Sequence, residues 1–174
     1  GLVSNMCEGN SSIYVGAQNC SSNEEGAYTG EVSAKMLGSL SVDYVIVGHS
    51  ERREMFNESN NSVLSKVKLA LSNDIIPIFC CGEPLSVREQ NNHINYIFNQ
   101  LEDSILKLEK EEFKNLVIAY EPIWAIGSGN SASKKDIDEV HSSIRSKIKS
   151  KYGSSVAQSV SILYGGSVSP INAK

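Results

Sequence analysis

The chain has 174 residues, of which 40% are hydrophobic and 21% are charged, a composition typical of one globular domain with a substantial core. The formal net charge of −4 and the pI near 5.4 argue against a nucleic-acid or anionic-membrane partner, because such partners usually require a basic face. They do not exclude a local basic pocket for a small anion. No apolar run is long enough to cross a bilayer, and no segment resembles a signal peptide.

The cysteines and histidines form none of the common sequence patterns of disulfide frameworks or metal sites. The four cysteines are Cys7, Cys20, Cys80 and Cys81, without a C-x-x-C spacing, and the three histidines are His49, His93 and His141, without an H-x-x-x-H spacing. We therefore expect free thiols in a reducing cytoplasm, no zinc site and no metal.

Strand and helix patterns alternate along the chain. Apolar runs predict strands over residues 13–17, 43–47, 75–79, 116–120 and 160–164, although Pro77 is unfavourable inside the third. Apolar stripes at helical spacing predict helices over residues 30–40, 63–71, 94–108 and 137–148, the last begun by a capping box at Ser133 and Asp136. At the end of the sequence, Ser169 and Pro170 match the first two positions of a further helix.

This alternation predicts α/β units on a parallel sheet, and no linker or composition break divides residues 1–174, so we expect a single domain. Five strands would suffice for an open doubly wound sheet. A closed (β/α)8 barrel needs eight strands in about 250 residues, so this chain would lack three. Periodicity alone leaves both architectures open.

Residues with catalytic chemistry follow the predicted strands, and active sites of both architectures form at the carboxyl ends of strands. Gly-His-Ser-Glu-Arg-Arg occupies residues 48–53, Glu121 begins Glu-Pro-Ile-Trp, and glycine-rich segments follow at residues 127–129 and 165–166. Glycine-rich loops expose backbone N–H groups that can bind a phosphate. A carboxylate and an imidazole beside such loops favour proton transfer on a small phosphorylated substrate.

Each feature alone also has a structural explanation, such as an ion pair for Glu121 or a turn for the glycines. Other chemistries fit less well. The segment at 48–52 lacks the last glycine of a nucleophile elbow, and no P-C-x-x-C follows the H-x-E at residues 49–51. No G-x-G-x-x-G dinucleotide fingerprint is present.

Together these segments resemble the triosephosphate isomerase family. The resemblance rests on Gly-His-Ser-Glu-Arg-Arg, on Ala-Tyr-Glu-Pro-Ile-Trp-Ala-Ile-Gly-Ser-Gly at residues 119–129 and on Ile-Leu-Tyr-Gly-Gly-Ser-Val at residues 162–168. Ala-Gln-Asn-Cys at 17–20 and Gly-Ala-Tyr-Thr-Gly-Glu at 26–31 add two further matches in order. The resemblance implies a (β/α)8 barrel, of which this chain holds about the third to seventh strands, and an isomerase that needs no cofactor.

The resemblance also implies roles for individual residues. Glu121 would be the catalytic base and His49 the electrophile, supported by Ser50 and Glu51. Gly127 and Ser167 would bind the substrate phosphate through their N–H groups. The lid and the residues that hold it closed would be Pro122, Ile123, Trp124, Ala125, Ile126, Ser128, Gly129 and Tyr164, together with the Ser167 side chain.

A homodimer is implied as well. Its contacts would involve Thr29 and Glu31 of the loop over residues 20–31, and Arg52 of the segment at residues 48–53. The family's first two strands and last strand, which carry a lysine and a glycine pair of the active site, have no counterpart among these 174 residues. We therefore expect a chain shortened at both ends that is inactive by itself. The alternatives are an inactive remnant that only binds partners, or another phosphate-binding barrel enzyme such as an aldolase, for which no Schiff-base lysine at a strand end is evident.

Overall fold

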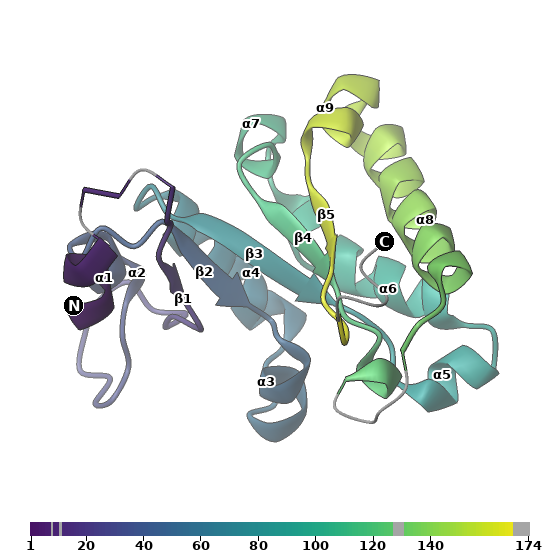
Figure 1. Ribbon diagram of the computed structural model, residues 1–174, viewed down its shortest axis with the longest axis horizontal. Coiled ribbons are helices and arrows are strands. Elements are labelled where there is room, and N and C mark those ends of the chain that lie inside the picture. Colours follow the sequence, from purple (N-terminus) through teal and green to yellow (C-terminus); the bar gives the residue numbers. More distant parts are fainter. Residues whose placement is uncertain (8, 11, 127–130, 169–174) are drawn as a thin grey trace. The chain divides into compact units, whose positions relative to one another are not determined.

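The computed structural model describes residues 1–7, 9–10, 12–126 and 131–168, and strands and helices alternate along it (Figure 1). The chain divides into two compact units, residues 1–79 and residues 80–174, each with its own buried apolar side chains. The single domain over residues 1–174 stays a prediction. The residues expected to begin a last helix, Ser169 and Pro170, lie outside the described residues.

The first unit is a parallel sheet with helices. Its elements are α1 (Leu2–Cys7), β1 (Gly16–Ala17), α2 (Ala34–Gly38), β2 (Tyr44–Val47), α3 (Ser50–Met55), α4 (Asn60–Leu71) and the start of β3 (Ile76–Cys81). β2 pairs in parallel with β1 on one side and with β3 on the other, where Pro77 lies opposite Val45. α4 packs on β2 through fully buried valines, among them Val63 and Val67. Pro77 therefore does not prevent the predicted strand.

The first strand is shorter than predicted. The sequence predicts a strand over residues 13–17, yet only Gly16 and Ala17 form the ladder. The side chain of Asp43 accepts a hydrogen bond from the Val15 N–H at 2.7 Å, and the Val15 carbonyl accepts from Asp43 and Tyr44. The Asp43 side chain therefore takes the place of a strand partner at Val15, and the ladder begins at Gly16, three residues later than predicted.

The second unit contains the end of β3 and a second parallel pair, β4 (Val117–Tyr120) and β5 (Ile162–Tyr164). Its helices are α5 (Leu85–Glu89), α6 (His93–Glu102), α7 (Lys110–Phe113), α8 (Lys134–Tyr152) and α9 (Ser154–Ser159), with single 3₁₀ turns η1 (Ile105–Lys107) and η2 (Ile123–Ala125). Every strand pair described within a unit is parallel. The predicted α/β architecture is thus confirmed.

The helix predictions hold with one correction. α4 and α8 match, α8 begins with the predicted capping box of Ser133 and Asp136, and α2 covers a shorter part of residues 30–40. The prediction of a helix over residues 94–108 is wrong beyond Glu102, where α6 ends. The Ser104 hydroxyl bonds the Gln100 carbonyl, and the 3₁₀ turn that follows still buries Ile105 and Leu108. The apolar stripe thus correctly indicates buried side chains on both sides of this break, but they belong to a helix and a separate 3₁₀ turn rather than to one continuous helix.

A buried ionic cluster lies between α3 and α4 in the first unit. The side chains of Glu58 and Lys66 are only 5% and 4% exposed, and they contact each other through Oε1 of Glu58. Arg52 donates to the same oxygen at 2.7 Å, and Lys66 donates to Asn19 at 2.8 Å. Burial alone would raise the pKa of Glu58, but the hydrogen bonds from Lys66 and Arg52 outweigh it and lower the pKa below its ordinary 4.5.

We expect Glu58→Gln to lower the free energy of unfolding of the whole protein by about 3–5 kcal/mol, because it leaves the Lys66 ammonium buried without its counter-charge. Since the folded pKa of Glu58 is depressed, its contribution is present above pH 4.5 and is lost as the pH falls through the folded value. Urea denaturation at several pH values measures both effects. Glu25→Gln is the matched control, because the Glu25 side chain is 78% exposed and its contact with Lys35 spans 3.6 Å.

We expect His141 to make the folded state of the second unit less stable in mild acid. It lies on α8 with its ring edge-on to Tyr120 at 6.0 Å between centroids, and its buried Nε2 has no hydrogen-bond partner among the described residues. Burial, followed by the charge of Arg145, lowers the pKa of His141 below its ordinary 6.5. The unfolded chain therefore binds a proton at pH values where the folded chain does not.

The folded state should consequently lose stability as the pH falls below 6.5, and His141→Asn should remove that part of the slope. Denaturant midpoints across a pH series that spans 6.5 test this. Parallel curves for the wild type and the variant would contradict the assignment to His141.

Candidate active site

In the first unit, a glycine turn with a positive φ places His49 at the start of a helix. Gly48 has φ +70°, and a Cβ there would lie 2.8 Å from the Arg53 guanidinium and 3.1 Å from Val63. Arg53 Nε also donates to the Gly48 carbonyl at 2.7 Å. Only glycine fits this turn, which ends β2 and makes His49 the N-cap of α3.

His49 is held by the backbone of the helix that it caps. Its Nδ1 accepts a hydrogen bond from the Glu51 N–H at 3.3 Å. A nitrogen that accepts must carry a lone pair, so this contact favours the neutral tautomer with its proton on Nε2. Ser50 next to it is buried, whereas the Glu51 side chain is largely exposed. The predicted group His49, Ser50 and Glu51 is thus brought together at one helix start.

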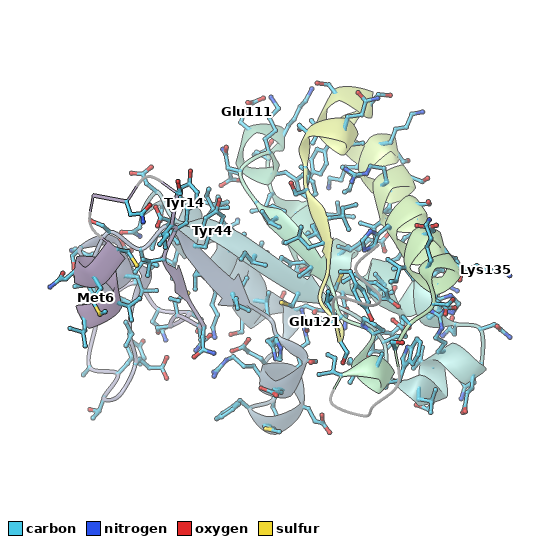
Figure 2. The ribbon with its side chains drawn as sticks, viewed as in Figure 1. Met6, Tyr14, Tyr44, Glu111, Glu121 and Lys135 are labelled. Atoms are coloured by element: carbon cyan, nitrogen blue, oxygen red, sulfur yellow. The ribbon has the colours of Figure 1, made fainter. Side chains whose placement is uncertain are left out.

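In the second unit, Glu121 directly follows β4 and is 5% exposed. Its N–H donates to the Cys81 carbonyl at 2.8 Å, which continues the sheet pairing by one residue. A Cβ on Gly165 would approach the Glu121 Cγ to 3.0 Å, so the side chain packs against bare backbone. In Figure 2, Glu121 and Glu111 of α7 mark opposite ends of β4. Glu121 therefore lies at the carboxyl end of the strand, as the sequence predicts.

The segment that follows Glu121 is the start of the predicted lid. Pro122 precedes η2, which holds Ile123, Trp124 and Ala125, and Ile126 closes the turn. The Ser167 hydroxyl donates to the Ala125 carbonyl at 3.0 Å, so the loop after β5 contacts the segment after Glu121, and its role in holding a lid closed stays a prediction. The Tyr164 hydroxyl is buried with no hydrogen-bond partner among the described residues. Gly127, Ser128 and Gly129 lie outside the described residues.

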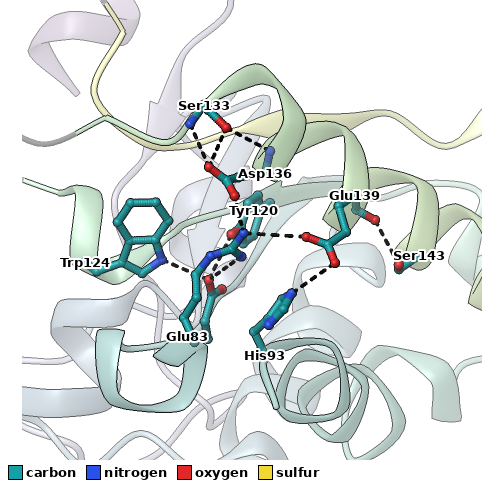
Figure 3. A network of polar contacts seen from close by, with 9 residues as sticks. Glu83, His93, Tyr120, Trp124, Ser133, Asp136, Glu139 and Ser143 are labelled. Atoms are coloured by element: carbon teal, nitrogen blue, oxygen red, sulfur yellow. Dashed lines mark hydrogen bonds and ion pairs between the residues drawn. The ribbon is translucent and has the colours of Figure 1, made fainter. Parts of the chain in front are cut away.

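A buried carboxylate anchors this segment (Figure 3). Glu83 is fully buried, and its Oε1 accepts from Trp124 Nε1 at 2.9 Å, from the Tyr120 hydroxyl at 3.1 Å and from Arg88 at 3.2 Å. The Glu83 carbonyl also accepts the Ile123 N–H at 3.2 Å. Burial and the Glu83 charge raise the pKa of Tyr120 far above its ordinary value, so the phenol stays a hydrogen-bond donor.

Arg88 carries the network to the long helix α8. It donates to Asp136 at 2.5 Å and lies 3.6 Å from Glu139, which in turn is 3.5 Å from Nε2 of the buried His93. Its guanidinium also lies 5.4 Å from the Trp124 ring centroid. Sequence reasoning did not assign roles to these residues. The available signal was Glu83 itself, an acid two residues after a strand, whereas two of its three donors, Tyr120 and Trp124, are 37 and 41 residues away.

The residues expected at a dimer contact all belong to the first unit. Thr29 and Glu31 are exposed in the loop over residues 20–31. Arg52 pairs with Glu58 inside the chain and lies 4.6 Å from the centroid of the Phe56 ring, which is 64% exposed. This surface is open to a partner, and the contact itself stays a prediction.

The described residues hold no group of three or more His, Cys, Asp or Glu side chains that could bind a metal ion. In the part of the chain that the structure describes, no helix combines the length and hydropathy needed to cross a membrane. All four cysteines are free thiols, and burial raises the pKa of Cys20 to about 11.

The family profile described as triosephosphate isomerase matches residues 2–174. A relative named triosephosphate isomerase from Cytophaga hutchinsonii is 53% identical over 165 residues, which make up 95% of this chain and 66% of that relative. Relatives of the same name from Porphyromonas gingivalis and Bacteroides fragilis are 49% and 51% identical over 162 residues, or 93% of this chain and 64% of each relative. The chain thus spans slightly less than two thirds of these relatives, and over that span it belongs to the triosephosphate isomerase family.

Proposed function

We propose that the whole protein to which these residues belong interconverts dihydroxyacetone phosphate and glyceraldehyde 3-phosphate. The observation that carries the proposal is the position of Glu121, a buried carboxylate at the carboxyl end of β4 with an anchored lid segment directly after it. The match of residues 2–174 to the isomerase family supports it. The remaining third of the relatives' length would supply the other strands, with the lysine and the glycine pair that the resemblance implies.

In the proposed reaction, the Glu121 carboxylate takes the proton from one substrate carbon and returns it to the neighbouring carbon. This family is itself a well-known example of such acid–base chemistry, and the roles of Glu121 and His49 are carried over from it. His49 presents Nε2–H to the carbonyl oxygen and stabilises the enediolate that forms between the two proton transfers. The isomerisation also moves one proton from the substrate hydroxyl oxygen to the former carbonyl oxygen, and in this proposal the His49 imidazole carries that proton between the two oxygens. Both protons therefore stay within the substrate and these two side chains, and no redox cofactor takes part.

The lid keeps water away from the enediolate, which could otherwise eliminate its phosphate group. Gly127 and the Ser167 N–H bind the phosphate in this proposal, and Ser128, Gly129 and Tyr164 complete the closed lid. The hydrogen bond from the Ser167 hydroxyl to Ala125 supports a link between the phosphate loop and the lid.

The proposed enzyme is a homodimer in the cytoplasm. The exposed Thr29 and Glu31 would reach the partner subunit, where Glu31 would pair with Arg52 of the partner subunit. The free cysteines support a reducing compartment.

We expect Glu121→Gln in the whole protein to lower kcat by at least about a thousandfold with little change in KM, because the amide cannot take the proton. The assay follows dihydroxyacetone phosphate formation from glyceraldehyde 3-phosphate. Glu111→Gln is the control, because it removes an exposed carboxylate at the other end of β4 (Figure 2). A variant at position 121 with wild-type kcat would remove Glu121 from the role of base.

We expect Trp124→Phe to weaken lid closure, because it deletes the Nε1–H donor to Glu83 and keeps an aromatic ring beside Arg88. The loss of one hydrogen bond should lower the free energy of unfolding by only about 1 kcal/mol. The share of turnovers that release inorganic phosphate should rise several-fold, since an open lid admits water. Phosphate release per turnover measures this share, and an unchanged value at lowered stability would show that the hydrogen bond serves folding alone.

A further inference from the structure

Gln100 is a buried polar side chain that the proposed reaction does not use. It lies on α6, far from β4 in the sequence, and is 7% exposed. Both ends of its carboxamide bond the same residue. Oε1 accepts from the Gly82 N–H at 2.9 Å, and Nε2 donates to the Gly82 carbonyl at 3.2 Å.

This paired contact satisfies the backbone N–H and carbonyl groups of Gly82 at the end of β3. Gly82 is the first residue beyond the strand, and its buried backbone groups would otherwise need another partner. The carboxamide offers one acceptor and one donor in the arrangement that a neighbouring strand would offer. Gln100 thus extends the hydrogen bonding of the strand by one residue from outside the sheet.

Gly82 also contacts the backbone of the proposed base, Glu121. A Cβ placed on Gly82 would lie 1.7 Å from the Glu121 carbonyl oxygen and 2.6 Å from its carbonyl carbon. The two backbones are therefore in direct contact, and the residue before Gly82 accepts the Glu121 N–H at 2.8 Å. A shift of Gly82 relative to Gln100 would therefore displace the Glu121 backbone that it contacts.

Glu121 therefore lies between two glycines. Gly165 bounds its side chain at the Cγ, and Gly82 bounds its backbone. Of these two glycines, Gly82 is held by the side chain of Gln100. That side chain can be changed without altering the carboxylate.

We propose that Gln100 is a positioning residue, which fixes Gly82 and through it the backbone of Glu121 for the proton transfer. The proposal rests on the proposed function and deepens it, because it names the residue that sets the placement of the base. A proton transfer is sensitive to displacements of the base well below the size of an atom. A residue of this kind should act on kcat more than on KM.

The test uses the whole protein with Gln100→Met, a substitution of similar size that removes both hydrogen bonds. We expect kcat to fall about tenfold or more, with KM within about twofold of wild type. A kcat equal to wild type would overturn the proposal. A wild-type protein without isomerase activity would overturn both this proposal and the proposed function, whereas an active wild type with an unaffected variant overturns this one alone.

A conservative variant separates positioning from general loss of structure. In Gln100→Glu, the protonated acid reproduces the carboxamide pattern, since its carbonyl accepts from the Gly82 N–H and its hydroxyl donates to the Gly82 carbonyl. Its kcat relative to wild type at the same pH should exceed that of Gln100→Met, and the difference should be largest at low pH. Equal kcat values for the two variants throughout the pH range would overturn the proposal.

Tyr152→Phe is the matched control for stability. It removes hydroxyl bonds to the carbonyls of Leu106 and Leu108, at 3.3 and 2.8 Å, where Tyr152 packs on Phe113 of α7. α7, which Glu111 marks in Figure 2, lies at the end of β4 away from Glu121. Tyr152→Phe should lower Tm while leaving kcat unchanged. If this control lowered kcat as much as Gln100→Met does at a similar loss of Tm, the effect at position 100 would be one of stability and the proposal would fail.

Discussion

The second unit depends on a single buried carboxylate oxygen, Oε1 of Glu83, that accepts hydrogen bonds from three side chains. Tyr120 ends β4, Trp124 lies in the 3₁₀ turn η2, and Arg88 belongs to α5. A buried carboxylate is stable only with such donors, so none of the three is easily exchanged. Because Arg88 also bonds Asp136, the start of the long helix α8 is tied to the same point. The strand end that carries Glu121 is thus fixed by elements far apart in the sequence.

Close backbone approach is the second constraint. Gly48, Gly82 and Gly165 each lie where a side chain would collide with a neighbour, although for different reasons. Gly48 also needs a positive φ, so that the chain can turn from β2 into α3 with His49 at the helix start. The proposed base and electrophile are therefore positioned mainly by backbone at strand ends. Groups held in this way need little reorganisation during a reaction.

The local patterns of the sequence predicted the strands, α4, α8 and the places of His49 and Glu121, because each depends on neighbours in the chain. They failed where a distant partner decides the outcome. Val15 leaves the first strand because Asp43 binds its N–H, and α6 stops before the apolar stripe ends. Glu83 could be noticed as an acid after a strand, but two of its three donors, Tyr120 and Trp124, are 37 and 41 residues away from it. The periodicity of apolar residues contains no information on polar side chains that pair over such distances in the sequence.

The Glu83 network is poorly explained by stability alone. Its Oε2 is buried with no hydrogen-bond partner among the described residues, which carries a desolvation cost. Buried ionic groups can often be replaced by apolar side chains of similar volume without loss of stability. Within the described ranges of the chain, Oε2 of Glu83 is left without a partner, while three donors share Oε1. This arrangement fixes the positions of the three donor side chains more than it stabilises the folded state. Glu83 bonds Tyr120, the residue before the proposed base, and Trp124, three residues after it. We infer that the network maintains the orientation of the segment between them.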